Sequence, residues 1–264
     1  MSAREVTRRK RRGARARRQL SEGNRTPMSD KKPAAVITGG TGGLGQAVSL
    51  AFLDAGWDVM VTFVEEEQFQ ELERKADAKA SSLRGICADL TRADEVERLA
   101  QETRREFGAI EALVNLVGGF AGGFPVTQTP EAVWDHMMRL NLKTCFLTVR
   151  ALAPLVVENG GGAIVTVGSR GAVETPPGLA AYAVSKAGVV ALTKALAEEL
   201  RRDRVRVNCV LPSIIDTPAN RSAMPDADFS RWVRPEALAR TILFLVSEEA
   251  APISGACIPV YGDS

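Results

Sequence analysis

The chain has 264 residues, of which 45% are hydrophobic and 25% charged, and its formal net charge is +2. This length suits one large α/β domain built around a single core. No uninterrupted apolar run approaches the roughly 18 residues that span a bilayer, so we expect no membrane segment. The single histidine, His136, excludes a multi-histidine metal centre, and we expect no metal site.

The cysteines are far apart along the chain. Cys87, Cys145, Cys209 and Cys257 lack the paired spacing that zinc sites and redox motifs use. We therefore expect reduced, mostly buried thiols in a cytoplasmic protein.

Positive charge is concentrated at the N-terminus. Residues 1–32 hold twelve Lys and Arg against three acids, whereas the remaining chain holds 22 basic and 29 acidic residues. A segment so charged and so poor in apolar side chains is predicted to be disordered. It could be a basic arm for nucleic acid or an organelle-targeting segment. The sequence favours a third interpretation, in which Met28 is the true start, because a short polar lead then precedes the first strand directly. Nucleic-acid contact is thus not expected.

From residue 33 to residue 264 we expect one domain. Short β-branched runs alternate with helical patterns, which predicts an α/β fold with a single doubly wound, parallel, seven-stranded sheet and helices on both faces. The expected strands are 34–38, 58–63, 83–88, 111–117, 163–168, 204–211 and 257–261. The expected helices are 43–55, 65–80, 92–107, 130–158, 179–202 and 235–247. The irregular stretch of about 212–234 is too long for a plain connection, so we expect a substrate lid there.

A glycine-rich turn follows the first strand and opens into the first helix. Glycines at such a place permit a tight turn and a close approach to a pyrophosphate, while the helix N-terminus supplies N–H donors. A surface turn without a ligand is the alternative. The cofactor-binding hypothesis assigns contacts to Thr38, Gly39, Thr41, Gly43, Leu44 and Gly45.

The spacing Thr-Gly-x-x-x-Gly-x-Gly resembles the cofactor motif of the short-chain dehydrogenase/reductase superfamily, and the resemblance extends over residues 34–262. It implies a Rossmann-type fold that binds NAD(H) or NADP(H). Asp89 and Leu90 match the family's contacts to adenine. Asn115 and Gly118 match the two ends of its Asn-Asn-Ala-Gly motif, which here is Asn-Leu-Val-Gly.

The end of the second strand bears on the choice of cofactor. In the family, an acid there bonds the ribose of NAD, whereas basic residues there or in the glycine turn hold the phosphate of NADP. This chain has Phe63 and Val64 at the strand end and Gly42 in the turn. Glu65 and Glu66 follow and would repel an additional phosphate. The sequence therefore favours NAD(H).

Tyr182 and Lys186 are the strongest catalytic candidates. Positions i and i+4 share one helix face, so the lysine ammonium and an oxidised nicotinamide would lower the pKa of the tyrosine phenol. Ser169 ends the fifth strand thirteen residues earlier, where its hydroxyl would bond the substrate oxygen. The resemblance adds Asn141, whose family counterpart holds a water that links the lysine to solvent. A chance surface pair, or a relic that only binds cofactor, is the alternative.

The segment 208–217 resembles the family stretch that runs past the nicotinamide. The resemblance implies cofactor contacts from Pro212, Ile215 and Thr217, in addition to those of Tyr182 and Lys186. Ser213 stands where the family usually has glycine, which predicts a stiffer lid hinge.

The substrate is less clearly indicated. Segments 118–123, 216–221 and 224–232 resemble dihydropteridine reductases, which use NADH. The complete set of four catalytic candidates favours reduction of a small carbonyl substrate, as in 3-oxoacyl thioester reductases. A quinonoid dihydropteridine reductase is the alternative enzyme, and a non-catalytic cofactor-binding protein the alternative of another class. The resemblance also implies a homodimer or homotetramer formed through helices 130–158 and 179–202.

Overall fold

The computed structural model describes residues 32–263 of the chain. Pro33–Ser264 form one compact unit. The predictions for the basic N-terminal segment, including disorder and a start at Met28, lie outside the described residues.

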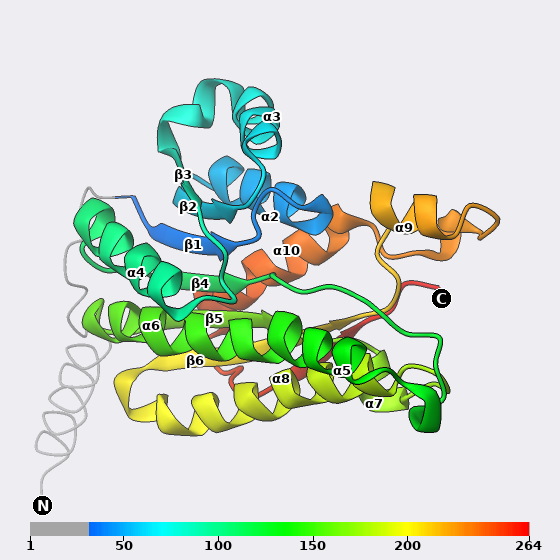
Figure 1. The fold of residues 1–264 in the computed structure, drawn as a ribbon. Coiled ribbons are helices and arrows are strands. Elements are labelled where there is room, and N and C mark those ends of the chain that lie inside the picture. The colour runs from blue at the N-terminus through cyan, green and yellow to red at the C-terminus, as the bar shows by residue number, and fades with distance from the viewer. Residues whose placement is uncertain (1–31, 264) are drawn as a thin grey trace, which may run out of the picture. The chain divides into compact units, whose positions relative to one another are not determined.

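Seven parallel strands form one sheet in the order β3-β2-β1-β4-β5-β6-β7 (Figure 1). The predicted α/β fold with a seven-stranded doubly wound sheet is therefore confirmed. The strands are β1 (Ala34–Thr38), β2 (Asp58–Phe63), β3 (Leu83–Cys87), β4 (Ala112–Asn115), β5 (Gly162–Val167), β6 (Val205–Pro212) and β7 (Cys257–Val260).

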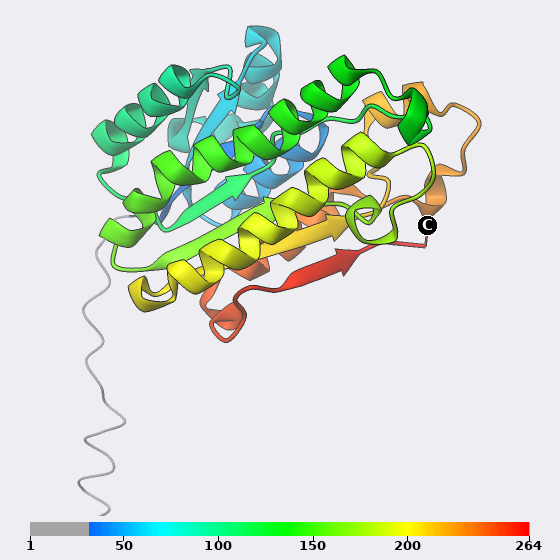
Figure 2. The same ribbon diagram turned by 60° about the horizontal axis from the view of Figure 1, so that its bottom comes forward.

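Helices cover both faces of the sheet. Helices α4, α6 and α8 lie on one face, and α2, α3 and α10 lie on the other (Figure 2). The long helices are α2 (Gly43–Asp54), α3 (Glu66–Ala76), α4 (Ala93–Phe107), α6 (Thr144–Glu158), α8 (Ala180–Glu199) and α10 (Pro235–Val246). The shorter helices are α5 (Glu131–Met137), α7 (Gly171–Glu174) and α9 (Pro218–Ala223).

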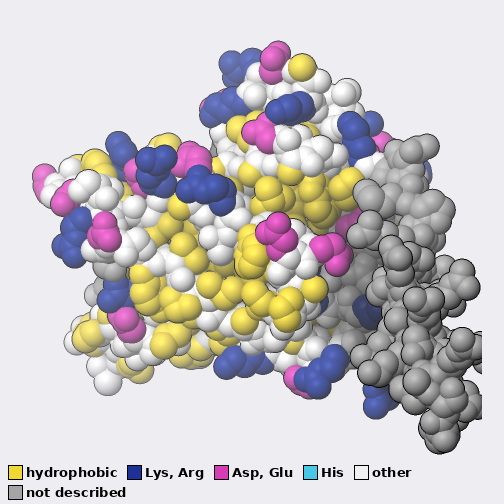
Figure 3. All heavy atoms as spheres, turned by 180° about the vertical axis from the view of Figure 1, so that it is seen from behind, with side chains coloured by type: hydrophobic (Ala, Val, Ile, Leu, Met, Phe, Trp, Pro, Cys, Tyr) yellow, Lys and Arg dark blue, Asp and Glu magenta, His cyan; other side chains and the backbone are white. Residues whose placement is uncertain are grey.

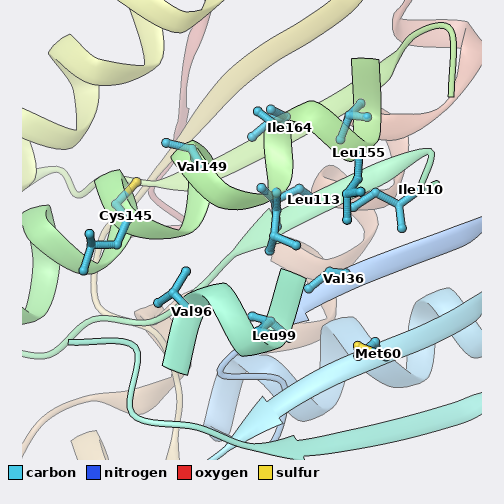
Figure 4. Packing of buried hydrophobic residues seen from close by; sticks show 14 of the residues in the cluster. Val36, Met60, Val96, Leu99, Ile110, Leu113, Cys145, Val149, Leu155 and Ile164 are labelled. Carbon is cyan, nitrogen blue, oxygen red and sulfur yellow. The ribbon is translucent and has the colours of Figure 1, made fainter. Parts of the chain in front are cut away.

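Each inner strand is buried on both faces, which is why its sequence is almost continuously apolar. Val36 belongs to the core under α4, α6 and α8, whereas its neighbour Ile37 belongs to the core under α2 and α10. Figure 4 shows Leu113 and Ile164 of the sheet beside Leu155 of α6. The two layers of core hold the carboxyl ends of the strands in register.

Three predicted elements differ most clearly from the structure, and the strand expected over 111–117 is also shorter, Ala112–Asn115. The helix expected over 65–80 ends at Ala76, because Asp77 has a positive φ of 48° and a 3-10 turn, Asp77–Ser82, follows. The helix expected over 130–158 is interrupted by a π-helical segment, Met138–Lys143. The expected lid contains α9 and a 3-10 turn, Phe229–Arg231, and Ile215 forms a β-bridge with Val233.

Two helical segments of the described chain, Glu131–Glu158 and Ala180–Glu199, are long and apolar enough to span a membrane by composition alone. The expectation of no membrane segment was based on uninterrupted apolar runs, and it stays a prediction. Both segments contact the sheet, and α8 also contacts the π-helical segment beside α6. Packing inside the fold buries 56% of the most apolar window of the first segment and 39% of that of the second.

Apolar side chains gather over the middle of the face opposite to that of Figure 1. Figure 3 shows a broad area of apolar side chains there, with few charged side chains among them. Apolar side chains are also exposed on helices of the other face, including Phe146 of α6 and Val184 of α8. Both faces therefore leave apolar surface in contact with solvent.

Candidate active site

A cavity of about 1100 Å³ lies at the carboxyl ends of the strands. β1 pairs with both β2 and β4, so the order of strands reverses there, and this is where open α/β sheets bind ligands. Most of the predicted site residues line this one cavity: Gly39, Thr41, Gly43, Leu44, Gly45, Phe63, Asp89, Leu90, Gly118, Ser169, Tyr182, Lys186, Pro212 and Ile215.

The glycine turn has the close backbone packing that the sequence predicts. Gly39 has a φ of 64°, in the left-handed region. A Cβ at Gly45 would lie 2.0 Å from the carbonyl oxygen of Gly39, so only glycine lets α2 begin against the turn. No side chain caps the first turn of α2, whose N–H groups therefore stay available for an anion. The turn fits a pyrophosphate.

Thr38 and Asn115 are buried behind the residues that line the cavity. They are buried neighbours at the ends of β1 and β4, and the Thr38 hydroxyl donates to Asn115 Oδ1 at 2.7 Å. The same hydroxyl accepts a bond from the backbone N–H of Leu116 at 3.1 Å. These two predicted cofactor contacts thus tie the glycine turn to the segment after β4.

The end of β2 forms the wall that faces the turn. The Thr62 hydroxyl accepts a bond from the Gly39 N–H at 2.9 Å, and Thr41 donates to Gln68 at 3.2 Å. Gln68 in turn donates to the Glu65 carboxylate at 2.5 Å. Among the described residues that line the cavity at this end, none is basic.

Asp89 and Leu90 line the cavity just after β3. The Asp89 carboxylate accepts a hydrogen bond from the Thr91 N–H at 2.9 Å, which lowers the pKa of Asp89. Asp89 is exposed and Leu90 is buried. The pair offers an anionic edge and an apolar surface to a ligand.

Tyr182 reaches the cavity from the first turn of α8, beside Ser169 at the end of β5. Burial raises the pKa of Tyr182, and a hydrogen bond with Ser169 lowers it by less. This differs from the expected lowering by Lys186. The phenol therefore keeps its proton at neutral pH.

Lys186 is a buried cation, 6% exposed, one helical turn from Tyr182. Its Nζ donates to the carbonyl oxygen of Val167 at 3.0 Å. Burial lowers the pKa of Lys186, because the charged form loses its hydration. A Cβ at Gly118 would lie 2.9 Å from this Nζ, so the glycine makes room for the lysine head.

Asn141 lies in the π-helical segment and does not line the cavity itself. Its Oδ1 accepts from the Gly119 N–H at 2.8 Å, and its Nδ2 donates to the Gly119 carbonyl at 3.1 Å. The same Nδ2 donates to Ser185 at 2.9 Å. Asn141 therefore joins the loop after β4 to α8, the helix that carries Tyr182 and Lys186.

The segment after β6 closes one side of the cavity. Pro212 and Ile215 line it, whereas Thr217 caps α9 by accepting a bond from the Asn220 N–H. The Thr217 side chain also lies against the glycine turn, since a Cβ at Gly43 would be 2.8 Å from Thr217 Cγ2. The lid thus rests on the glycine turn.

Several groups at the site have no signal in the sequence. Val167 and Gly119 act through backbone atoms, and Ser185 acts on Asn141 from a different helix. Phe120 packs edge-on against the ring of Tyr182 at 5.0 Å between centroids. Only tertiary contact identifies these residues.

The chain matches the model of the short chain dehydrogenase family over residues 33–228, and it belongs to this family. It is thus an NAD(P)-dependent oxidoreductase. It is 31% identical over 235 residues to the 3-oxoacyl-[acyl-carrier-protein] reductase of Thermotoga maritima, covering 86% of this chain and 95% of that protein. It is 32% identical to the (2S)-[(R)-hydroxy(phenyl)methyl]succinyl-CoA dehydrogenase subunit BbsD of Thauera aromatica, covering 89% of this chain and 97% of that protein.

A solved structure has the same fold. The L-sorbose reductase of Gluconobacter frateurii, complexed with NADPH and L-sorbose, superposes with a TM-score of 0.81 at 26% identity, covering 89% of this chain and 97% of that one. None of these three proteins is named as a dihydropteridine reductase, and nothing in the comparisons supports that resemblance specifically.

The residues present fit a nicotinamide dinucleotide. The glycine turn would hold the pyrophosphate, Asp89 and Leu90 would flank the adenine, and Tyr182 and Lys186 lie at the far end of the same cavity. When bound, the nicotinamide supplies or accepts hydride.

Proposed function

We propose that this enzyme reduces the carbonyl group of a small, apolar ketone, with a preference for NADH. The observation that carries the proposal is the partly buried phenol of Tyr182 beside Ser169 at the wall of the cavity. A carbonyl oxygen that receives a proton as hydride arrives at its carbon needs such an acid. Ser169 would donate a hydrogen bond to the same oxygen.

The walls around Tyr182 support an apolar substrate. Most side chains that line this end of the cavity are apolar: Phe120, Leu140, Pro176, Leu179, Ile214 and Met224. The charged pair Arg170 and Glu174 also lines it, but these two bind each other at 2.7 Å. Apolar walls favour a substrate with an alkyl or aryl group next to its carbonyl. Two relatives carry names of 3-oxoacyl and phenyl-substituted thioester oxidoreductases, in keeping with this class.

The carbonyl proposal is tested with purified protein and NADH against alkyl ketones, aryl ketones, 3-oxoacyl thioesters and polyhydroxy ketones. We expect turnover of the apolar substrates, and we expect Tyr182→Phe to lower kcat by about 10²- to 10⁴-fold, because it removes the general acid. Tyr261→Phe changes the chain's other tyrosine and should stay within a few-fold of the wild type.

Bound cofactor is titrated in both variants by NADH fluorescence. A Tyr182→Phe protein that binds NADH normally yet turns over as fast as the wild type would refute the assigned role. Turnover of polyhydroxy ketones alone would refute the apolar substrate class.

The preference for NADH rests on charge at the end of β2. Glu65 bonds Gln68 there, and Val64 is 67% exposed. None of the described residues that line the cavity beside Val64 is basic. An additional phosphate would meet a carboxylate and no cation. The sorbose reductase structure contains NADPH, so the proposed preference rests on the residues of this chain and not on that relative.

We expect a kcat/KM for NADH at least about tenfold above that for NADPH, a difference of about 1.4 kcal/mol. Val64→Arg should raise kcat/KM for NADPH, because it places a cation at this wall. Val126→Arg, at a valine that is 74% exposed outside the cavity lining, is the matched control. A wild-type enzyme that uses NADPH as well as NADH would overturn the preference.

We also propose that the protein forms a homo-oligomer through helices α5, α6 and α8. Trp134, Phe146 and Val184 of these helices are 40%, 44% and 46% exposed. Apolar side chains of this size on neighbouring helices are typical of subunit contacts.

A further inference from the structure

Cys209 and Cys257 lie side by side on neighbouring strands, although 47 positions of sequence separate them. They are in-register partners of β6 and β7, which are parallel. Partners on adjacent strands are about 4.8 Å apart and point to the same face. This separation is within the Cα–Cα range of disulfides, about 4.4–6.8 Å. The two thiols influence each other's pKa, and Cys209 Sγ donates to the Val210 carbonyl at 3.6 Å.

The two thiols differ in reactivity. Cys257 is partly exposed on β7, which is an edge strand, and the Cys209 thiol together with the charge of Lys194 lowers the pKa of Cys257 to about 6. Cys209 is fully buried, and the neighbouring Cys257 thiol and burial raise its pKa. An accessible thiolate beside a second thiol is the arrangement of oxidation-sensitive cysteines.

The pair also lies close to the catalytic residues. A Cβ at Gly168 would be 3.1 Å from Cys209 Sγ, and Gly168 joins Val167, which accepts the Lys186 bond, to Ser169. Cys209 is three positions before Pro212, which lines the cavity. Any movement of Cys209 is therefore transmitted directly to the carboxyl ends of β5 and β6.

We propose that Cys209 and Cys257 form an oxidisable dithiol that closes to a disulfide and lowers the activity of the site beside it. A hydroperoxide supplies the oxidising equivalents. The Cys257 thiolate attacks the peroxide, the O–O bond breaks, and Cys257 becomes a sulfenic acid as hydroxide or alkoxide leaves. The Cys209 thiol then attacks the Cys257 sulfur, which releases water as the S–S bond forms. Two thiols have lost two electrons and two protons to one peroxide.

The Cα spacing permits a disulfide at this place, but the Cβ atoms must approach each other slightly. Relaxed disulfides hold their Cβ atoms about 3.8 Å apart, which is closer than the spacing of parallel strands. The S–S bond must therefore draw β7 and β6 together beneath α8. A bond formed against such strain is readily reduced, which suits a reversible switch.

The experiment treats the reduced full-length chain with hydrogen peroxide, blocks remaining thiols with an alkylating agent and maps the peptides by mass spectrometry. We expect a Cys209–Cys257 disulfide in most chains, a several-fold loss of NADH affinity or of turnover, and recovery of both with dithiothreitol. Cys257→Ser should resist the loss. Cys87→Ser, which changes an exposed cysteine whose in-register partner on the neighbouring strand is Phe63, should respond as the wild type.

Peroxide products confined to Cys87 would overturn the proposal, and so would a disulfide that leaves NADH binding and turnover unchanged. An equal loss of activity in Cys257→Ser would overturn it as well. Thermal unfolding of each variant identifies one that fails to fold, in which case Cys257→Ala takes the place of Cys257→Ser. The peptide map and the NADH titration need no substrate, so an incorrect substrate class does not affect either result.

Discussion

At the scale of single residues, the site depends on polar groups whose burial costs folding free energy. Lys186 is buried, yet its ammonium has the Val167 carbonyl as its hydrogen-bond partner. Burying a charge that has few hydrogen-bond partners opposes folding. A bound cofactor and substrate, however, interact with that same buried charge. Lys186 thus lowers the stability of the folded protein while it serves the site.

We predict that Lys186→Met abolishes turnover but does not lower the free energy of unfolding at neutral pH. The methionine fills a similar volume and removes the cost of a buried charge. Chemical denaturation of both proteins measures the difference. A loss of more than about 2 kcal/mol in the variant would contradict this account.

The difference in free energy of unfolding between the wild type and Lys186→Met has a defined pH dependence. Because burial lowers the pKa of Lys186, the folded protein releases this proton at a lower pH than the unfolded chain, whose lysine has a pKa of about 10.4. Between those two values the unfolded state binds more protons, so the wild type gains stability as pH rises. The stability advantage of Lys186→Met should shrink over this window, and a difference that grows with pH would refute the assignment.

At the scale of elements, the turn between β1 and α2 depends on backbone contacts that no side chain tolerates. Gly45 sits against the Gly39 carbonyl, while a Cβ at Gly42 would find nothing nearer than 3.5 Å. Two glycines of one motif therefore have different roles. Gly45 permits packing, and Gly42 leaves room for a ligand.

We predict that Gly45→Ala destabilises the protein by about 2 kcal/mol or more and removes NADH binding, because α2 must shift away from the turn. Gly42→Ala should fold with nearly the stability of the wild type. Thermal unfolding and NADH titration check both variants. Equal effects of the two substitutions would show that the close approach at Gly45 is unimportant.

The π-helical segment is the element that joins the cofactor loop to the catalytic helix. Sequence periodicity predicts one continuous helix over 130–158, and the chain is indeed helical there. The change from i→i+4 to i→i+5 hydrogen bonding over Met138–Lys143 appears only in the structure. Within that segment, Asn141 binds both Gly119 and Ser185.

At the scale of the whole molecule, apolar surface remains exposed on helices outside the cavity. We predict that Phe146→Glu together with Val184→Glu dissociates a homo-oligomer, because two carboxylates would be buried at the contact between copies. Light scattering after size-exclusion chromatography measures the mass. Val126→Glu, at an exposed valine of the loop before α5, is the control. A wild type that is already monomeric would refute the proposed assembly.

The sequence by itself determined the strands, the order of strand and helix, and the catalytic and glycine-turn candidates, because these depend on local periodicity and on short spacings. Tyr182 and Lys186 share a helix face, and Thr38 to Gly45 form one turn. At both places, residues that are close in sequence are also close in space. Cytoplasmic localisation stays a prediction.

Only the tertiary structure decided which distant groups meet. The partner of Lys186 is a backbone carbonyl from β5, Phe120 reaches Tyr182 from the loop after β4, and Cys209 meets Cys257 through strand register. Sequence spacing made all four cysteines look isolated. Contacts between strands that are neighbours in space but distant in sequence leave no periodic pattern, and the pKa of each buried group depends on such contacts.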